Sequence, residues 1–476
     1  MTIPSWPIWL VLGVVWTIAM SIVIVLQRRS PASTMAWLMV LAFLPVVGLG
    51  AYLVVGPMRL ERKKKRRRMS RLVVKEALGA FAILESESHD PDVAELAHVA
   101  VGAGEAPPLS AERVDVYLEG QGAFDAIFAA IEAATHHVHV EYYIWEPDGL
   151  GTALRDLLCA RARAGVKVRL LLDGLGAWGC SDKFLAPLTA AGVEVAWFNP
   201  IRFRLRGFRR PDFRTHRKIV VCDGVIGFAG GMNVTDKQTV GKGDVPAWRD
   251  THVGFTGTAV RALQRVFLDD WAFAADDAPP IADPALFPTP RAPGPELVQV
   301  VSSGPDAATF AIHKTMFAAI NASSRRLWIT TPYFVPDDAI SQALTTAAYR
   351  RVDVRLLIPK CSDSKLVDLA ARSYVPELLD AGVRVFEYLP RFIHAKTIVV
   401  DEEVALVGSA NLDNRSFRLN FEVAMLLYGA GPNALLATAF ERDAAQAREL
   451  TRTEFARAKF FTRLGQAGAR LLSPFL

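Results

Sequence analysis

The stretch THRKIVVCDG at residues 215–224 and the stretch IHAKTIVVDE at residues 393–402 follow one pattern. Each has a histidine and a lysine two positions apart, then a run of apolar, mostly β-branched residues, then an aspartate. Residues two apart in a strand point to the same side, so the histidine and the lysine are expected to share a face. Because the pattern occurs twice, the chain is predicted to contain two copies of one unit that share a single site.

The spacing within the two copies continues beyond the strand. In both, the aspartate follows the histidine by seven residues and an asparagine follows ten residues later, which gives the sets His216, Lys218, Asp223, Asn233 and His394, Lys396, Asp401, Asn411. A fixed ammonium group beside an imidazole repels a metal cation and attracts a phosphate. The pattern therefore predicts phosphoryl chemistry, with no metal site, no cofactor and no nucleotide-binding loop.

Both copies match the HxKxxxxD motif of the phospholipase D superfamily, and the chain resembles its bacterial cardiolipin synthase branch over nearly its whole length. Three stretches support the resemblance: Gly230-Gly231-Met232-Asn233, Trp248-Arg249-Asp250, and Gly408 to Ser416 with the sequence GSANLDNRS. The resemblance implies transfer of a phosphatidyl group from one phosphatidylglycerol to another, which yields cardiolipin and glycerol. It also implies a covalent phosphohistidine, with His216 as the nucleophile and His394 as the general acid and base.

The resemblance assigns the other site residues as well. The family pattern implies that phosphate oxygens are held by Lys218, Lys396, Asn233 and Asn411, and that the two imidazoles are oriented by Asp250 and Glu422. Ser409 stands where the first copy has Gly231, so it either donates to phosphate or packs. Asp223 and Asp401 belong to the catalytic motif, but an aspartate between two apolar runs is equally typical of a hairpin turn.

Apolar strands alternate with helical stretches in both halves, for example 166–172 with 150–163, and 352–358 with 364–380. This alternation predicts an α/β fold of two phospholipase D-like repeats, with mixed sheets flanked by helices and a pseudo-twofold relation. The expected boundaries are residues 107–274 for repeat 1, a proline-rich linker at 275–296, and residues 297–476 for repeat 2.

The N-terminal part has a different composition. Residues 6–26 and 35–55 are uncharged and have about the 20 residues that a membrane span needs, so residues 1–57 are expected to form a transmembrane hairpin, or a re-entrant pair. Residues 58–106 form a connector whose basic run, 59–68, carries a charge of +7, more than the +5 of the whole chain. This local charge favours anionic lipids over nucleic acid as the partner. It also places the body on the cytoplasmic side of a bacterial inner membrane.

Three further stretches lead to secondary hypotheses. Residues 201–214 alternate arginines with aromatic residues, which suggests either a loop against lipid phosphates or a solvated hairpin. His136, His137 and His139 lack nearby cysteines, so they are not expected to bind a metal. The C-terminal stretch 434–472 is predicted to be helical and to pack in the core, and the apolar end 471–476 is a weaker candidate for lipid contact.

Membrane proximity selects among the activities of such a site. Lipid alcohols at high effective concentration compete with water for the covalent intermediate, which favours phosphatidyl exchange. The alternatives are a phospholipase D that hydrolyses lipids, a phosphatidyltransferase for another alcohol, a membrane-tethered nuclease, and a non-catalytic lipid-binding scaffold. A nuclease would need a basic groove, and a scaffold would be free to lose one motif residue, whereas His, Lys and Asn are intact in both copies.

Overall fold

A computed structural model describes residues 6–26, 31–44, 48, 91–200, 213–275, 283–289, 294–307, 309–457 and 459–476. It divides the chain into two units. One is Met1–Lys65 with Arg202–Arg210, and the other is Arg66–Ile201 with Pro211–Leu476. The second unit contains both copies of the motif.

The N-terminal unit contains α1 (Trp6–Leu26) and α2 (Pro31–Phe43). Ile24 and Leu41 are fully buried between the two helices. In the part of the chain described, no helix has the length and apolar composition of a membrane span, and α2 ends well before residue 55. The prediction of two transmembrane helices is therefore not supported. The basic run 59–68 lies outside the described residues.

The sheet of the first repeat has seven strands in the spatial order β2-β8-β7-β6-β3-β4-β5. Their bounds are β2 (Arg113–Glu119), β3 (His137–Tyr142), β4 (Lys167–Asp173), β5 (Glu194–Phe198), β6 (Lys218–Cys222), β7 (Ile226–Gly230) and β8 (Arg249–Thr256). β3, β4 and β5 are parallel, and the other pairings are antiparallel. The sheet is therefore mixed, as predicted.

The second repeat has a nine-stranded sheet in the order β1-β9-β17-β15-β14-β10-β12-β13-β18. Its strands are β1 (Leu109–Ala111), β9 (Glu296–Ser303), β10 (Arg326–Thr330), β12 (Asp353–Pro359), β13 (Arg384–Tyr388), β14 (Thr397–Val400), β15 (Val404–Gly408), β17 (Glu422–Tyr428) and β18 (Ala447–Glu449). The middle seven strands repeat the order and directions of the first sheet. This shared topology confirms the internal repeat.

Two elements lie on the other side of the predicted repeat boundary. β1 lies within the predicted repeat 1 but pairs with β9 of the second sheet. α5 (Pro91–Gly102), from the predicted connector, places Leu96, Ala97 and Ala100 in the second repeat's core. The connector therefore completes repeat 2, because its apolar residues are buried there.

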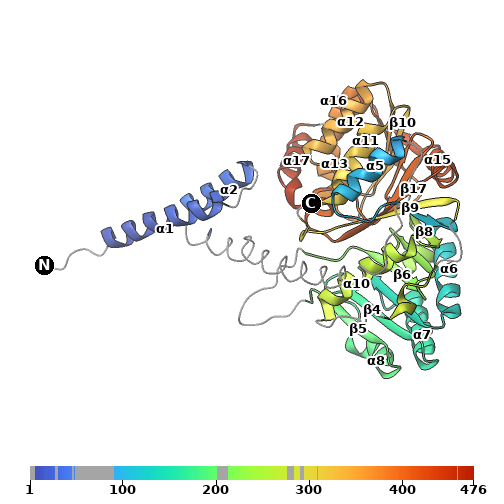
Figure 1. Ribbon diagram of the computed structural model, residues 1–476. Helices are drawn as coiled ribbons and strands as arrows, with labels where there is room; N and C mark the ends of the chain where they lie inside the picture. The colour runs from blue at the N-terminus through green and yellow to red at the C-terminus, as the bar shows by residue number, and fades with distance from the viewer. Residues whose placement is uncertain are drawn as a thin grey trace. The chain divides into compact units, whose positions relative to one another are not determined.

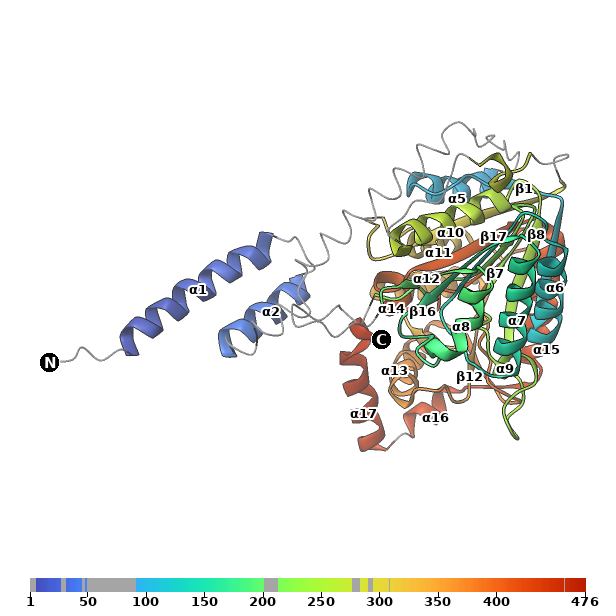
Figure 2. The ribbon, with the colours of Figure 1, turned by 90° about the horizontal axis from the view of Figure 1, so that it is seen from below.

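The helices cover both faces of each sheet (Figure 1). In the first repeat they are α6 (Gly120–Ala133), α7 (Gly149–Arg163), α8 (Asp182–Ala190), α9 (Asp236–Thr239) and α10 (Val260–Ala275). In the second they are α11 (Ala311–Ala322), α12 (Asp338–Tyr349), α13 (Lys365–Ala381), α14 (Asn414–Arg418), α15 (Ala430–Ala444), α16 (Arg452–Ala456) and α17 (Phe460–Leu471). Figure 2 shows α6 and α7 on one side of the first sheet and α10 on the other. Burial on both faces explains why the strands are almost continuously apolar.

Capping residues begin and end the helices that the sequence predicts. The Asp148 side chain accepts from the Gly151 amide at the start of α7, and the Ser364 hydroxyl accepts from the Val367 amide at the start of α13. α13 ends at Gly382, whose φ of 96° only glycine adopts easily. These caps lie within a residue or two of the predicted helix ends.

The two repeats join at the ends of the motif strands. Thr215 forms a parallel bridge with Phe421, and Arg249 forms one with Ile393. Each bridge links the residue before a motif histidine to the start of a strand in the other repeat: Phe421 directly precedes β17, and Arg249 is the first residue of β8. The two contacts correspond to each other under the internal repeat, so the repeats dock in a reciprocal, pseudo-twofold manner.

Candidate active site

Both motif histidines lie at this junction between the repeats. The His216 amide donates to the Phe421 carbonyl at 2.8 Å, and the His394 amide donates to the Arg249 carbonyl at 2.7 Å. The two residues are only 8% and 5% exposed. Each histidine is therefore fixed by backbone of the opposite repeat, and the two motifs are brought to one place.

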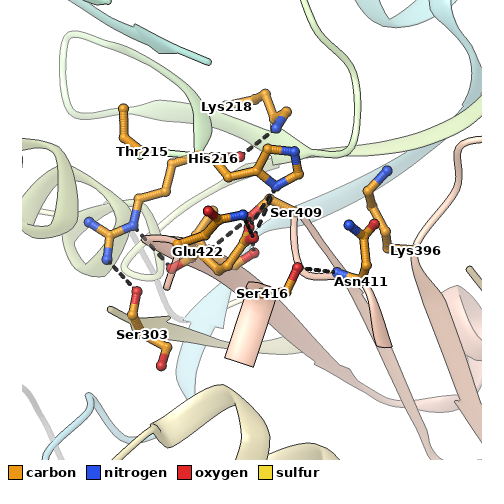
Figure 3. Close-up of polar contacts among 12 residues, drawn as sticks. Thr215, His216, Lys218, Ser303, Lys396, Ser409, Asn411, Ser416 and Glu422 are labelled. Carbon is orange, nitrogen blue, oxygen red and sulfur yellow. Dashed lines mark hydrogen bonds and ion pairs between the residues drawn. The ribbon is translucent and has the colours of Figure 1, made fainter. Parts of the chain in front are cut away.

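Each imidazole pairs with a carboxylate of the other repeat. His216 Nδ1 lies 3.0 Å from both carboxylate oxygens of Glu422, and His394 Nδ1 lies 2.7 Å from Oδ2 of Asp250. Figure 3 shows Glu422 beneath the His216 ring, with Ser409 beside it. An Nδ1–H that donates to a carboxylate leaves Nε2 as the nitrogen with a free lone pair. The residues predicted to orient the rings thus do so across the repeat boundary.

Burial and charge set the protonation states of these pairs. Burial lowers the pKa of His216 and of His394 to about 4, despite the opposing effect of the carboxylates. Burial alone would raise the pKa of Glu422, but the charge and hydrogen bonds of His216, Lys218 and Ser409 bring it to about 2. The pKa of Asp250 is likewise held below its usual value by His394 and Lys396, against the effect of burial. Near neutral pH each pair is therefore a neutral imidazole and a carboxylate.

Lys218 and Lys396 occupy equivalent positions near the histidines. Each Nζ donates to the carbonyl oxygen of its own motif histidine. Burial, as the largest effect, lowers the pKa of Lys218 to about 7 and that of Lys396 to about 8, and the nearby carboxylates of Glu422 and Asp250 oppose it at both. The charge of Lys396 further lowers the pKa of Lys218. Two buried lysines beside the two histidines form a site suited to a phosphate.

The two asparagines also lie at the junction. Asn233 accepts from the Ile144 amide at 3.2 Å through its oxygen, and it is 1% exposed. Asn411 donates to Asp413 at 3.1 Å, and its amide oxygen is buried without a partner in the described part of the chain. Both asparagines are therefore held by neighbours from the strand ends that line the site.

Ser409 contacts the carboxylate rather than facing open space. Its hydroxyl donates to Glu422 Oε2 at 2.5 Å and accepts from the Val423 amide at 3.0 Å. Its one proton is therefore used, so the hypothesis that it donates to phosphate is not supported in this arrangement. In the first repeat a side chain does not fit at this position, because a Cβ on Gly231 would lie 2.2 Å from Asp250 Oδ1.

Asp223 and Asp401 lie away from the histidines. Asp223 accepts from the amides of Thr135, His136 and His137, and Asp401 accepts from those of Ser324, Arg325 and Arg326. Both sit in hairpin turns with φ of 54° and 44°, at the far ends of β6 and β14. A strand of four or five residues separates them from the site by roughly 15 Å. The structure therefore places these two residues in the turn position that the sequence left open, and their catalytic role stays an untested prediction.

Several residues near the histidines were given no role from sequence. The Tyr143 ring lies 5.0 Å from that of His216, and the Trp248 ring lies 5.2 Å from that of His394. Gln238 donates to Asp250, and Asn420 donates to Glu422. Tyr143 and Trp248 adjoin predicted strands and motifs, so their positions in the sequence could have suggested a place in the site. No feature of the sequence around Gln238 or Asn420 pointed to the site.

Arg217, between His216 and Lys218, has its side chain among buried residues of the opposite repeat and of α10. Its guanidinium donates to the backbone carbonyls of Glu422 and Ser303, and it pairs with Asp270. It is fully buried, and the second motif has the small Ala395 in its place. Arg217 thus ties the strand that carries Glu422 to the first motif.

No group of three or more His, Cys, Asp or Glu side chains among the described residues is arranged to hold a metal ion. His137 and His139 instead share Gln264 of α10 through hydrogen bonds of 3.3 and 2.9 Å. Burial lowers the pKa of His137 to about 4. These histidines are packed between β3 and α10, which is a structural role.

The arginine-rich stretch is described only at its end, since residues 201–212 lie outside the described part of the chain. Phe213 and Arg214 are buried, and Arg214 donates to the Asn199 carbonyl and lies 3.5 Å from Asp173. These two residues therefore do not belong to a lipid-facing loop.

Comparison with known proteins places this geometry in context. A family model described as the cardiolipin synthase PLD-like domain matches residues 127–271 and 316–444, and one described as phospholipase D-nuclease N-terminal matches residues 14–57. A cardiolipin synthase of Geobacillus kaustophilus is 39% identical over 96% of this chain and 92% of its own length. A cardiolipin synthase of Alkalihalophilus pseudofirmus is 37% identical over 98% and 95%.

Among solved structures, the phosphatidylserine synthase of Haemophilus influenzae superposes with a TM-score of 0.61. It is 15% identical and covers 80% of this chain and 100% of its own. At this identity the likeness concerns the fold alone.

Proposed function

Because the chain belongs to the cardiolipin synthase family of phospholipase D-like proteins, we propose that it transfers a phosphatidyl group from one phosphatidylglycerol to another. The products are cardiolipin and glycerol. The chain is accordingly a phosphatidyltransferase of the phospholipase D type. Phosphatidylglycerol and anionic membrane lipids are its partners.

One observation carries the proposal of a single two-histidine site. His216 and His394 each pair with a carboxylate of the opposite repeat, Glu422 and Asp250. A reaction in two steps needs one group that bonds to phosphorus and another that moves a proton. Two neutral imidazoles with oriented Nε2 atoms, beside two lysines, supply both.

The steps follow from these positions. His216 Nε2 attacks phosphorus, and the bond from phosphorus to the glycerol oxygen breaks. His394 supplies the proton to that oxygen, since a bound phosphodiester brings negative charge that favours the protonated ring. His394 then removes the proton from the hydroxyl of a second phosphatidylglycerol, whose oxygen attacks phosphorus and releases His216.

The lysines and asparagines stabilise the charge that develops during both steps. In this role Lys218 and Lys396 turn from the histidine carbonyls toward the non-bridging phosphate oxygens, and Asn233 and Asn411 donate further hydrogen bonds. Charge-assisted hydrogen bonds are stronger in a buried site than in water, so these contacts lower the barrier most where burial is greatest.

The site works at a membrane in this proposal. The N-terminal match at residues 14–57 and the basic run at 59–68 support association with the bacterial inner membrane, with the catalytic unit on its cytoplasmic face. Proximity to lipid favours an alcohol acceptor over water.

The test uses purified full-length protein and phosphatidylglycerol labelled in its terminal glycerol, in mixed micelles without nucleotide. We expect labelled glycerol and a four-chain lipid, and loss of both in His216→Ala and His394→Ala, with the exposed His98→Ala as a matched control. Release of glycerol with phosphatidic acid as the main lipid product would instead identify a hydrolase.

A second substrate separates the two histidines. A phosphodiester with a nitrophenol leaving group needs no proton on departure, so His394→Ala should still release nitrophenol and accumulate a covalent phosphoryl-protein. His216→Ala should do neither. The opposite pattern would exchange the two roles.

A further inference from the structure

Helix α17 (Phe460–Leu471) presents its apolar side to the solvent. Phe460, Phe461 and Leu471 are 71%, 80% and 80% exposed, and Leu464 is 55% exposed. Large apolar side chains are usually buried, and grouped exposure on one element marks an interaction surface. Leu472, just after the helix, is also 44% exposed. We call these five residues the α17 apolar face.

The inner side of the helix is occupied by other residues. Gln466 and Ala469 are buried, and Arg470 lies 4.2 Å from the Tyr374 ring of α13 and 3.5 Å from Glu377. At 100° per residue these positions lie roughly opposite the apolar face. The helix is thus already docked on the protein through its small and polar side, so the apolar face is directed to a partner outside this unit.

The charge around the face selects that partner. After Glu454 the chain has no acidic side chain, and it carries Arg457, Lys459, Arg463 and Arg470. A helix with aromatic and leucine residues on one side and flanking basic residues suits the headgroup region of an anionic bilayer. A second copy of the chain would add like charge to this surface, which disfavours self-association.

The end of the helix is connected to the site. The Ser473 hydroxyl accepts a 3.0 Å hydrogen bond from the Tyr374 hydroxyl, and the Leu476 carbonyl accepts from the Arg415 amide at 2.9 Å. Arg415 belongs to α14, which begins three residues after Asn411. The segment that follows α17 is therefore hydrogen-bonded to α13 and α14, and α14 begins close to Asn411.

We propose that α17 is an interfacial helix that inserts its apolar face into the headgroup layer of an anionic membrane and holds the catalytic unit against the surface. The consequence is that lipid reaches the site from the bilayer without full extraction. This role concerns the body of the enzyme and is separate from any attachment through the N-terminal unit.

A local probe tests insertion independently of the N-terminal attachment. In full-length protein with the exposed Cys361 changed to Ser, Phe461→Cys carries an environment-sensitive fluorophore, and Tyr349→Cys, 71% exposed on α12, serves as the matched control. On phosphatidylglycerol vesicles containing lipids brominated near the headgroup, we expect at least about twofold quenching at position 461 and none at 349. Equal quenching of the fluorophore at positions 461 and 349 would overturn the proposal. So would quenching at position 461 that disappears when the protein is diluted to monomers, because that result would indicate contact between copies of the chain.

The effect on turnover rests on the proposed function, and the quenching result does not. The double variant Phe460→Ser, Phe461→Ser should raise the apparent KM on vesicles by roughly five- to tenfold. With short-chain phosphatidylglycerol below its micelle concentration the same variant should match wild type, as should Tyr349→Ser on both substrates. An unchanged KM on vesicles would refute the role of α17. If neither wild type nor any variant transferred the phosphatidyl group, but quenching at position 461 remained, the proposed activity would be refuted and the membrane contact of α17 would stand.

Discussion

The Nδ1 atom of His216 lies 3.0 Å from the carboxylate of Glu422, 206 residues later in the chain and in the other repeat. Glu422 also accepts from Ser409 and Asn420, so three donors hold one buried carboxylate. His394 and Asp250 form the corresponding pair in the opposite direction. Neither repeat alone contains an oriented histidine, so a competent site requires the docked pair.

This relationship predicts the effect of removing the charge while keeping the shape. Glu422→Gln should lower turnover by roughly 10²- to 10⁴-fold, because the amide no longer selects the tautomer with Nε2 free. The measurement is the rate of cardiolipin formation with saturating phosphatidylglycerol. Glu402→Gln, in an exposed hairpin turn, is the control. Wild-type turnover in the Glu422 variant would show that the pair has no part in the chemistry.

Gly231 is predicted to be irreplaceable for a steric reason. A Cβ there would lie 2.2 Å from Asp250 Oδ1, so Gly231→Ala must displace the carboxylate that orients His394. We expect a loss of roughly 10- to 100-fold in kcat, with a destabilisation of about 1–3 kcal/mol. Gly122→Ala, whose Cβ would come no closer than 3.9 Å to any neighbour, should keep full activity and gain up to about 1 kcal/mol. Equal kcat in the two variants would contradict the steric argument.

Asp223 should matter for stability rather than turnover. Asp223→Ala removes the acceptor for three amides and leaves a non-glycine residue at φ 54°, so unfolding should become about 1–2 kcal/mol easier. Asp223→Asn keeps one acceptor oxygen and tolerates this φ, so its loss should be smaller. Thermal unfolding and kcat of the folded fraction are measured together. A kcat that falls more than about tenfold in the Asn variant, at unchanged stability, would return Asp223 to the reacting groups.

The pH dependence of kcat/KM follows from the buried histidines and lysines. Burial lowers the pKa of His216 and His394 to about 4, so the nucleophilic neutral ring is lost only below that pH. Burial lowers the pKa of Lys218 to about 7, so its charge is lost as the pH rises above that value. Loss of the Lys218 charge should therefore steepen the alkaline decline of kcat/KM near pH 7–8, beyond the decline caused by deprotonation of His394, and loss of the neutral His216 ring should cause the decline near pH 4. Lys218→Arg, which stays charged, should move the alkaline decline upward, whereas the exposed Lys167→Arg should not. An alkaline limb that is identical in all three proteins would argue against the lysine.

Stability should fall as the solution is acidified below pH 6.5. Burial lowers the pKa of His137, His216, His252 and His394 to about 4, while the unfolded chain titrates near 6.5. Burial also lowers the pKa of His139 well below its usual value. Over this range the unfolded state binds more protons, so the free energy of unfolding decreases as the pH falls, with up to about five protons taken up. His252→Leu should reduce the slope by about one proton, since both ring nitrogens of His252 are buried without a partner in the described part of the chain. Thermal unfolding in detergent between pH 4 and 7 measures the slope, and a flat profile would contradict the assignment.

Local patterns in the sequence predicted many of the strands and helices. The strand predicted at 166–172 is β4 at Lys167–Asp173, and the helix predicted at 364–380 is α13 at Lys365–Ala381. The duplicated order of strands was also visible as an internal repeat. These features depend on side-chain periodicity and on capping residues, which act over a few positions.

Pairings between distant segments were decided by the tertiary structure. The resemblance to the family made Glu422 and Asp250 candidates, but the exchange of carboxylates between the repeats is visible only in the docked structure. The same holds for β1, which pairs with β9 across the predicted boundary, and for Asp223, whose turn lies at the far end of the strand from His216. Sequence periodicity shows which side of a helix or strand is apolar. The partner of a buried charge depends instead on which surfaces pack together, and this packing is determined by burial and hydrogen bonding over the whole chain.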